Sequence, residues 1–118
     1  MQDLKKRTKD FALDIVRSYS TLPRRMEVFV LAKQLLRSGT SVGAQYREAC
    51  RAKSNADFIS KVEGALQELE ESMYWLELLT ESGHMSTSDS ERLMAETREL
   101  TAIFTSVTKT VKSRAGAR

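Results

Sequence analysis

The chain has 118 residues, of which 41% are hydrophobic and 30% are charged. This length allows one domain with a real core, and the composition excludes a disordered chain. No apolar run approaches the ~20 residues that span a bilayer, and no apolar segment typical of a secretory signal follows the basic start. With Cys50 as the single cysteine, we expect a cytoplasmic protein without an intrachain disulfide.

The net charge of +3 is unevenly distributed along the chain. Residues 1–53 hold twelve Lys/Arg against five Asp/Glu, residues 54–83 hold one against seven, and residues 84–118 hold six against four. The basic part is suited to nucleic acid or an acidic partner. It is equally suited to packing beside the acidic helix of its own chain or of a neighbouring subunit. The charge pattern leaves both interpretations open.

A first helix is predicted from about residue 4 to about residue 21. Apolar residues recur there at helical spacing, with one threonine in the row, at Leu4, Thr8, Phe11, Ile15 and Leu22. Pro23 ends this helix, because proline disfavours the helical conformation of the residue before it.

A second, longer helix is predicted over about residues 24–52. One row of its small and apolar residues steps by three and four, through Phe29, Ala32, Leu36, Gly39, Gly43, Tyr46 and Cys50. This row places Cys50 in the core as a small hydrophobe. The periodicity passes through both glycines, so the helix is expected to continue there and to let a neighbouring helix approach closely. A phosphate-binding loop is disfavoured, because the Gly-Lys-Ser/Thr ending is missing.

A second apolar row on the same helix widens its apolar arc to about 160°, which exceeds the stripe that a bundle core needs. We therefore expect this row to lie partly in a subunit interface. The predicted oligomer-interface residues are Val28, Leu31, Leu35 and Val42.

The third and fourth helices are predicted over about residues 55–82 and 88–112. Ser54 caps the third and Gly83 stops it, whereas Ser88 and Glu91 form a capping box for the fourth. The third helix has a bundle seam at Ile59, Val62, Leu66, Leu69, Met73 and Leu76. Residues 113–118 form a basic, frayed tail. The whole chain, residues 1–118, is thus predicted to be one all-α domain, an antiparallel up-down-up-down four-helix bundle.

Nothing in the sequence indicates an enzyme, a cofactor or a metal site. The single histidine, His84, lies in a turn between helices and is expected to be solvated. A di-iron bundle site needs histidines from two helices, and a zinc site would have only Cys50 and His84 as soft ligands. No small-molecule substrate and no membrane association are evident.

Two charged stripes remain. Glu63, Glu70 and Glu77 repeat every seven residues on one edge of the third helix, which is typical of a solvated or ion-pairing edge. The predicted nucleic-acid-binding residues form a basic sector on the second helix: Lys33, Arg37, Arg47, Arg51 and Lys53. A second basic cluster begins the first helix, at Lys5, Lys6, Arg7 and Lys9. No aromatic residue is interleaved for base stacking, so binding is expected to be electrostatic and weakly sequence-specific.

The run QLLRSGTSVGAQYREACRAKSNADFISKVEGALQELEESMYWLELL, residues 34–79, resembles the bacterial four helix bundle protein family. This family is also named for reading frames in intervening sequences of 23S ribosomal RNA genes. The segments RSGTSVGA (37–44) and YWLEL (74–78) carry most of the resemblance, and Gln45 departs from the asparagine that is common in the family. The resemblance implies a bundle that assembles into a ring-like homopentamer and a link to RNA. The accessory proteins of diversity-generating retroelements look like distant members, and these bind RNA and a reverse transcriptase through a basic surface.

The leading hypothesis from the sequence is a non-catalytic, homo-oligomeric RNA-associated protein. The alternative is an oligomeric scaffold that binds another protein and uses the basic sector in ion pairs within or between subunits. The sequence names neither the RNA nor the protein partner.

Overall fold

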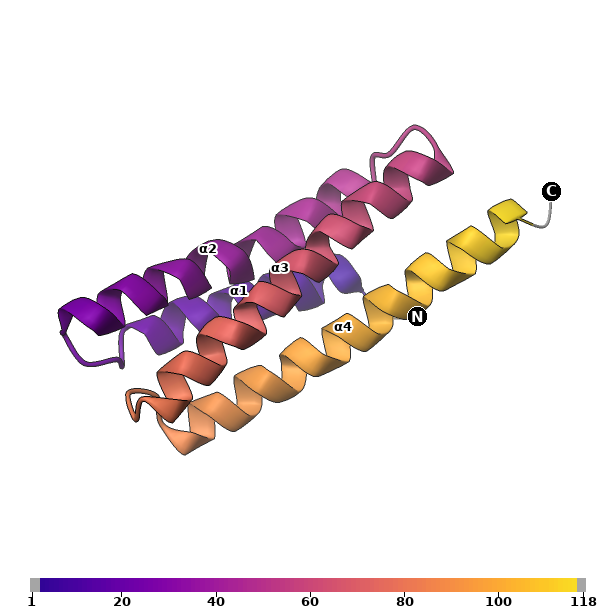
Figure 1. Cartoon of the computed structure of the whole chain (residues 1–118). Helices are drawn as coiled ribbons and strands as arrows, with labels where there is room; N and C mark the ends of the chain where they lie inside the picture. Colours follow the sequence, from indigo (N-terminus) through magenta and orange to yellow (C-terminus); the bar gives the residue numbers. More distant parts are fainter. Residues whose placement is uncertain (1–2, 117–118) are drawn as a thin grey trace.

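The computed structural model describes residues 3–116 as four antiparallel helices that form a rod 54 Å long and 21 Å in both other directions (Figure 1). The helices are α1 (Leu4–Tyr19), α2 (Met26–Ala49), α3 (Asn55–Glu81) and α4 (Thr87–Gly116). No strand occurs within residues 3–116. The prediction of an all-α, up-down-up-down bundle is confirmed.

The two ends of the rod differ in what they hold. The start of α1, the α2–α3 loop and the end of α4 lie at one end, here called the terminal end (Figure 1). The α1–α2 and α3–α4 loops lie at the other, the far end. Short links between consecutive helices force this arrangement, because each helix must return beside the one before it.

Local capping chemistry sets the beginning of each of the last two helices. Ser54 Oγ accepts a hydrogen bond from the Asp57 backbone N–H at 3.0 Å, as predicted. The predicted cap of α4 at Ser88 is wrong. Ser86 Oγ accepts instead from the Asp89 N–H at 3.1 Å, so the helix begins at Thr87. Both serines have an acidic residue three positions later, which is the spacing of a capping pair. The turn that follows α3 makes Ser86 the cap.

The other helix ends depart from the predicted bounds by a few residues. Gly83 follows α3 with φ of +80°, which confirms it as the stop. α1 ends two residues before the predicted position and α2 starts two residues after it, since Arg25 is extended. α4 continues to Gly116, so residues 113–116 are helical and not a frayed tail, whereas residues 117–118 lie outside the described residues.

The core combines one apolar stripe from each helix. α1 contributes Leu4, Phe11 and Ile15 together with the buried Thr8, as predicted. On α3 the buried row includes Val62, Leu69 and Leu76 from the predicted seam. Ile59 at its start is only half-buried, as is the pair of Leu66 and Met73. The half-buried pair lies toward the outer seam with α4, which leaves part of the apolar stripe at the surface.

α2 runs without a break through Gly39 and Gly43, as the periodicity predicted. A β-carbon at Gly39 would overlap the δ-methyl of Ile15, and one at Gly43 would lie 3.0 Å from Thr8 Oγ1. The two glycines therefore allow α1 to pack closely against α2. Cys50, in contrast, is exposed. Its predicted burial is wrong because α2 ends at Ala49 and no helix covers the residue after it.

Candidate nucleic-acid interface

The five predicted nucleic-acid-binding residues are all exposed in the single chain. Lys33, Arg37 and Arg47 belong to α2, whereas Arg51 and Lys53 lie in the α2–α3 loop. Arg37 differs from the others, because its Nη2 donates to Glu71 Oε1 at 2.8 Å and its Nη1 lies 3.9 Å from Glu68 Oε1. Arg37 is therefore an ion-paired link between α2 and α3.

The acidic residues of the basic half are each engaged. Asp3 caps α1, and the other four pair with a cation: Asp10 with Lys6, Asp14 with Arg92, Glu27 with Arg25 and Glu48 with Lys61. Hydrogen bonding to Asp10 raises the pKa of Lys6. Eight cations of this half make no ion pair with any residue in the described range: Lys5, Lys9, Arg17, Arg24, Lys33, Arg47, Arg51 and Lys53.

Five of these cations belong to the terminal-end parts of α1 and α2 and to the loop that follows α2. On α1, Arg7 and Asp14 turn toward α4, so Lys5 and Lys9 lie on the opposite flank, toward α2. The contact of Thr8 with Gly43 places them level with the last two turns of α2. We call the resulting group the basic surface; it consists of Lys5, Lys9, Arg47, Arg51 and Lys53. Lys33 lies further along α2, toward the far end.

The end of α4 adds three cations to the same end of the rod (Figure 1). Lys109, Lys112 and Arg114 are exposed, and Lys112 Nζ donates to Glu63 Oε2 at 3.0 Å. Helical spacing within one segment does not connect these residues with the basic sector. The signal was available, because an up-down-up-down bundle must bring the start of α1, the end of α2 and the end of α4 together.

The predicted oligomer-interface residues do not form a surface. Val28 is 1% exposed, Leu35 is 3% exposed and Val42 is fully buried in the core of the single chain, and only Leu31 is half-buried. The interface prediction is wrong for the first three. Two neighbouring helices, α1 and α3, flank α2 inside the chain, and together they cover the wide apolar arc that was attributed to another subunit.

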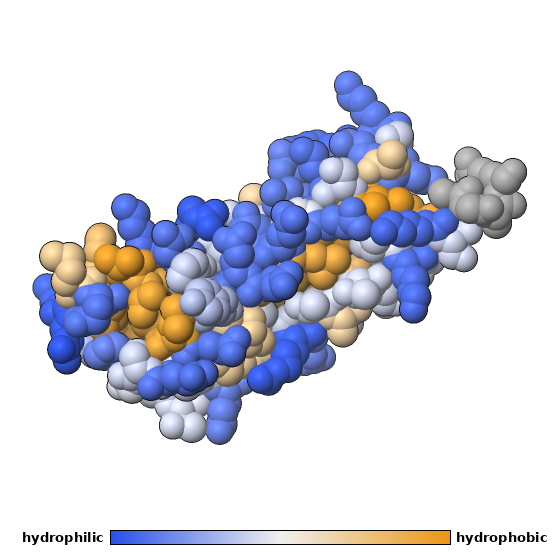
Figure 2. Space-filling view, viewed as in Figure 1, coloured by the Kyte–Doolittle hydropathy of each residue, from blue (hydrophilic) through white to orange (hydrophobic). Residues whose placement is uncertain are grey.

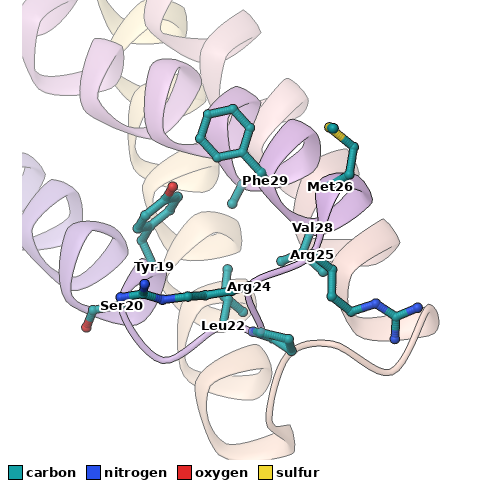
Figure 3. A pocket seen from close by; sticks show the side chains of 10 residues that line it. Tyr19, Ser20, Leu22, Arg24, Arg25, Met26, Val28 and Phe29 are labelled. Atoms are coloured by element: carbon teal, nitrogen blue, oxygen red, sulfur yellow. The ribbon is translucent and has the colours of Figure 1, made fainter.

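Other apolar side chains of α1 and α2 are exposed instead. They are Leu13, Val16, Met26, Phe29 and Val30, with Met26 80% and Phe29 52% exposed. A groove of about 740 Å³ lies beside the α1–α2 loop at the far end. Figure 3 shows Tyr19 from the end of α1 and Phe29 from the start of α2 on opposite sides of it, with Arg24 nearby. We call the five exposed side chains the apolar patch.

The described residues contain no group of three or more His, Cys, Asp or Glu side chains placed to hold a metal ion. They also contain no helix that is both long enough and apolar enough to cross a membrane. The basic surface and the apolar patch are two features of α1 and α2 that packing within the bundle does not require.

Comparison with known proteins shows the family of the chain. The family described as 23S rRNA-intervening sequence protein matches residues 2–106. The chain belongs to this family. It is also similar to a crystal structure of a protein of unknown function from the S23 ribosomal protein family of Bacteroides thetaiotaomicron. The two are 41% identical with a TM-score of 0.83, over 89% of this chain and 97% of the other. No curated protein matches the chain.

The resemblance seen in residues 34–79 is therefore confirmed at the level of the family and the fold. The similar structure carries no assigned function, and the family description names no catalytic activity.

Proposed function

We propose that the protein is a non-catalytic, homo-oligomeric RNA-associated protein that binds RNA electrostatically through the basic surface. The family description, which names the 23S rRNA intervening sequence, supports RNA as the nucleic acid. The observation that carries the proposal is the segregation of charge: the basic surface holds five exposed cations without an ion pair in the described chain. Rows of such cations bind phosphates by releasing condensed counterions.

The test is RNA binding as a function of salt. On filters, the logarithm of the affinity for an unstructured RNA should fall linearly with the logarithm of the salt concentration. The variant Arg47→Glu with Arg51→Glu should weaken binding and reduce the slope by roughly two phosphate contacts. Unrelated RNA sequences should be affected alike, because phosphate contacts carry no base information.

A matched control separates a local site from total charge. The variant Arg17→Glu with Arg98→Glu changes the net charge equally, and both residues are exposed and outside the basic surface. Its RNA affinity should fall much less than that of the Arg47/Arg51 variant. Equal losses in the two variants, or a wild type whose RNA binding does not depend on salt, would contradict the proposal.

Self-association is the second part of the proposal, and the apolar patch supports it. An apolar group of this kind on a single chain usually marks a contact surface, and the resemblance to a homopentamer family adds the expected number of five subunits. Light scattering at micromolar concentration should give an oligomer mass. Phe29→Asp should lower that mass without unfolding the chain, because Phe29 is already half-exposed. A monomer mass for the wild type would exclude this part.

The alternative function is a scaffold in which basic residues serve in ion pairs. The contact of Arg37 with Glu71 favours it, since one member of the predicted basic sector is used within the bundle. The alternative predicts that Arg47→Glu with Arg51→Glu breaks the oligomer. The RNA proposal predicts an intact oligomer with weakened RNA binding, so sizing of the same variant distinguishes the two.

A further inference from the structure

A second groove, of about 900 Å³, follows the outer seam between α3 and α4. Consecutive helices pack against each other and α4 also contacts α1, so this seam lies on the side of the rod opposite the seam between α1 and α2. The floor of the groove includes the half-buried Met73 of α3 and Met94 of α4. Part of this side is visible in Figure 2, where hydrophobic side chains lie between hydrophilic ones.

The rim of this α3–α4 groove is acidic. Three exposed carboxylates line it from α3: Glu70, Glu77 and Glu81. None of them forms an ion pair with a described residue. Arg98 lines the groove from α4 as the opposing cation. The groove is thus an apolar surface bordered by an excess of negative charge.

The apolar patch on the other side of the rod is bordered by positive charge. Arg24 lies beside Phe29 in the groove at the α1–α2 loop, and Lys33 follows Phe29 by one turn of α2. Both cations are exposed, lie outside the basic surface and form no ion pair in the described range. The nearby Glu27 is paired with Arg25. The patch and the α3–α4 groove therefore complement each other in charge, and both have apolar centres.

The charged parts of the two surfaces lie at the same level of the rod. The hydroxyls of Ser38 on α2 and Ser72 on α3 are 2.8 Å apart. Because the two helices are antiparallel, a residue five positions before Ser38 is level with one five positions after Ser72. Lys33 is therefore level with Glu77.

The apolar parts match in the same way. Ile15 of α1 packs on Gly39, which follows Ser38 on α2. The exposed Val16 is consequently about level with Met73, which follows Ser72 on α3. Two copies that stand side by side in the same direction, without an axial shift, bring the patch of one opposite the groove of the next.

We propose that the α3–α4 groove of one copy of the chain binds the apolar patch of a second copy, with Lys33 of one against Glu77 of the other. This inference rests on the self-association in the proposed function and names the surface that the apolar patch meets. Contact between two patches would oppose cations, and contact between two grooves would oppose carboxylates. Contact of patch with groove joins unlike charges. The assembly is therefore head-to-tail, and each copy uses two different surfaces.

The first test exchanges the two charges. Lys33→Glu and Glu77→Lys should each weaken self-association by about tenfold or more, measured by sedimentation equilibrium over a range of protein concentrations. A chain with both substitutions restores opposite charges across the contact and should assemble like the wild type. The controls, Lys109→Glu and Glu48→Lys, make the same charge changes at exposed residues outside both surfaces. They should leave assembly nearly unchanged.

The second test leaves one intact surface on each chain. Phe29→Asp removes the patch and Met73→Asp removes the groove, so each variant alone should be a monomer. In an equimolar mixture the patch of the Met73→Asp chain still fits the groove of the Phe29→Asp chain. The mixture should give a complex of two chains and no larger species. Ala102→Asp replaces Met73→Asp if circular dichroism shows unfolding, because Ala102 is an exposed lining residue of the groove.

Four results would overturn the inference. The folded double-charge variant stays dissociated, or the mixture contains only monomers. Folded groove variants keep the wild-type mass while Phe29→Asp lowers it, in which case self-association stands but the groove is free for a different protein. A monomeric wild type would contradict this contact and the proposed self-association together.

Discussion

Gly39 of α2 lies directly against the δ-methyl group of Ile15 of α1, in the space that a side chain at position 39 would need. Ile15 is 1% exposed, so its methyl has little room to move. We predict that Gly39→Ala destabilises the fold by about 1–3 kcal/mol through overpacking. Chemical denaturation followed by circular dichroism measures this change.

A compensating substitution tests the same contact. Ile15→Val removes the δ-methyl and alone should cost about 0.5–1.5 kcal/mol. Combined with Gly39→Ala it should cost less than the sum of the two single changes, which a double-mutant cycle detects. Additive losses would show that the two residues do not compete for this space.

The buried hydroxyls of Ser38 and Ser72, 2.8 Å apart, link α2 to α3. Ser72 Oγ also donates to the Glu68 carbonyl at 2.8 Å, whereas the second bond of Ser38, to the Leu35 carbonyl, is long at 3.4 Å. Ser72→Ala should therefore destabilise more than Ser38→Ala, by about 1 kcal/mol, since it leaves the other hydroxyl poorly satisfied. The two changes alter helix propensity equally, so the comparison is matched. Thermal or urea denaturation giving the reverse order would contradict it.

Tyr46 makes the stability sensitive to alkaline pH. Burial, followed by hydrogen bonding to Cys50, raises the pKa of Tyr46 to about 12. Because the folded state holds this proton more tightly than the unfolded state, the stability contribution is complete below pH ~10 and is lost as the pH rises toward ~12. The denaturation midpoint of the wild type should fall more steeply in this window than that of Tyr46→Phe. Parallel pH profiles would count against a partly buried phenol at this position.

Arg37 should contribute to the stability of the fold, whereas Arg51 should not. Burial, and then the charge of Glu71, raises the pKa of Glu68, whereas Arg37 lowers it. Arg37→Gln should thus destabilise the fold at neutral pH by up to about 1 kcal/mol. The difference from the wild type should shrink below the ordinary glutamate pKa of 4.5, where Glu68 is protonated.

Arg51→Gln is the matched control for this prediction. Arg51 is exposed and makes no ion pair in the described chain, so its removal should leave stability within about 0.5 kcal/mol of the wild type at both pH values. Urea titrations at pH 7 and pH 4 compare the two variants. An equal loss from Arg37→Gln at both pH values would exclude the proposed coupling to Glu68.

The sequence by itself determined the helices and most of the core. Apolar residues at steps of three and four can be buried on one face only by a helix, and Pro23, Ser54 and Gly83 act on their immediate neighbours. These are local effects, so they are readable before any packing is known. The same reasoning predicted the close approach at Gly39 and Gly43, because the periodicity continues through them.

Only the tertiary structure decided which face of each helix is covered and which charges meet. Val28, Leu35 and Val42 are core residues because two neighbouring helices cover the arc that appeared too wide for one bundle. Arg37 pairs with Glu71, whereas Arg51 has no such partner among the described residues, since the packing of α2 against α3 sets which side chains are in reach. These outcomes depend on contacts between residues far apart in the chain, which no local spacing encodes.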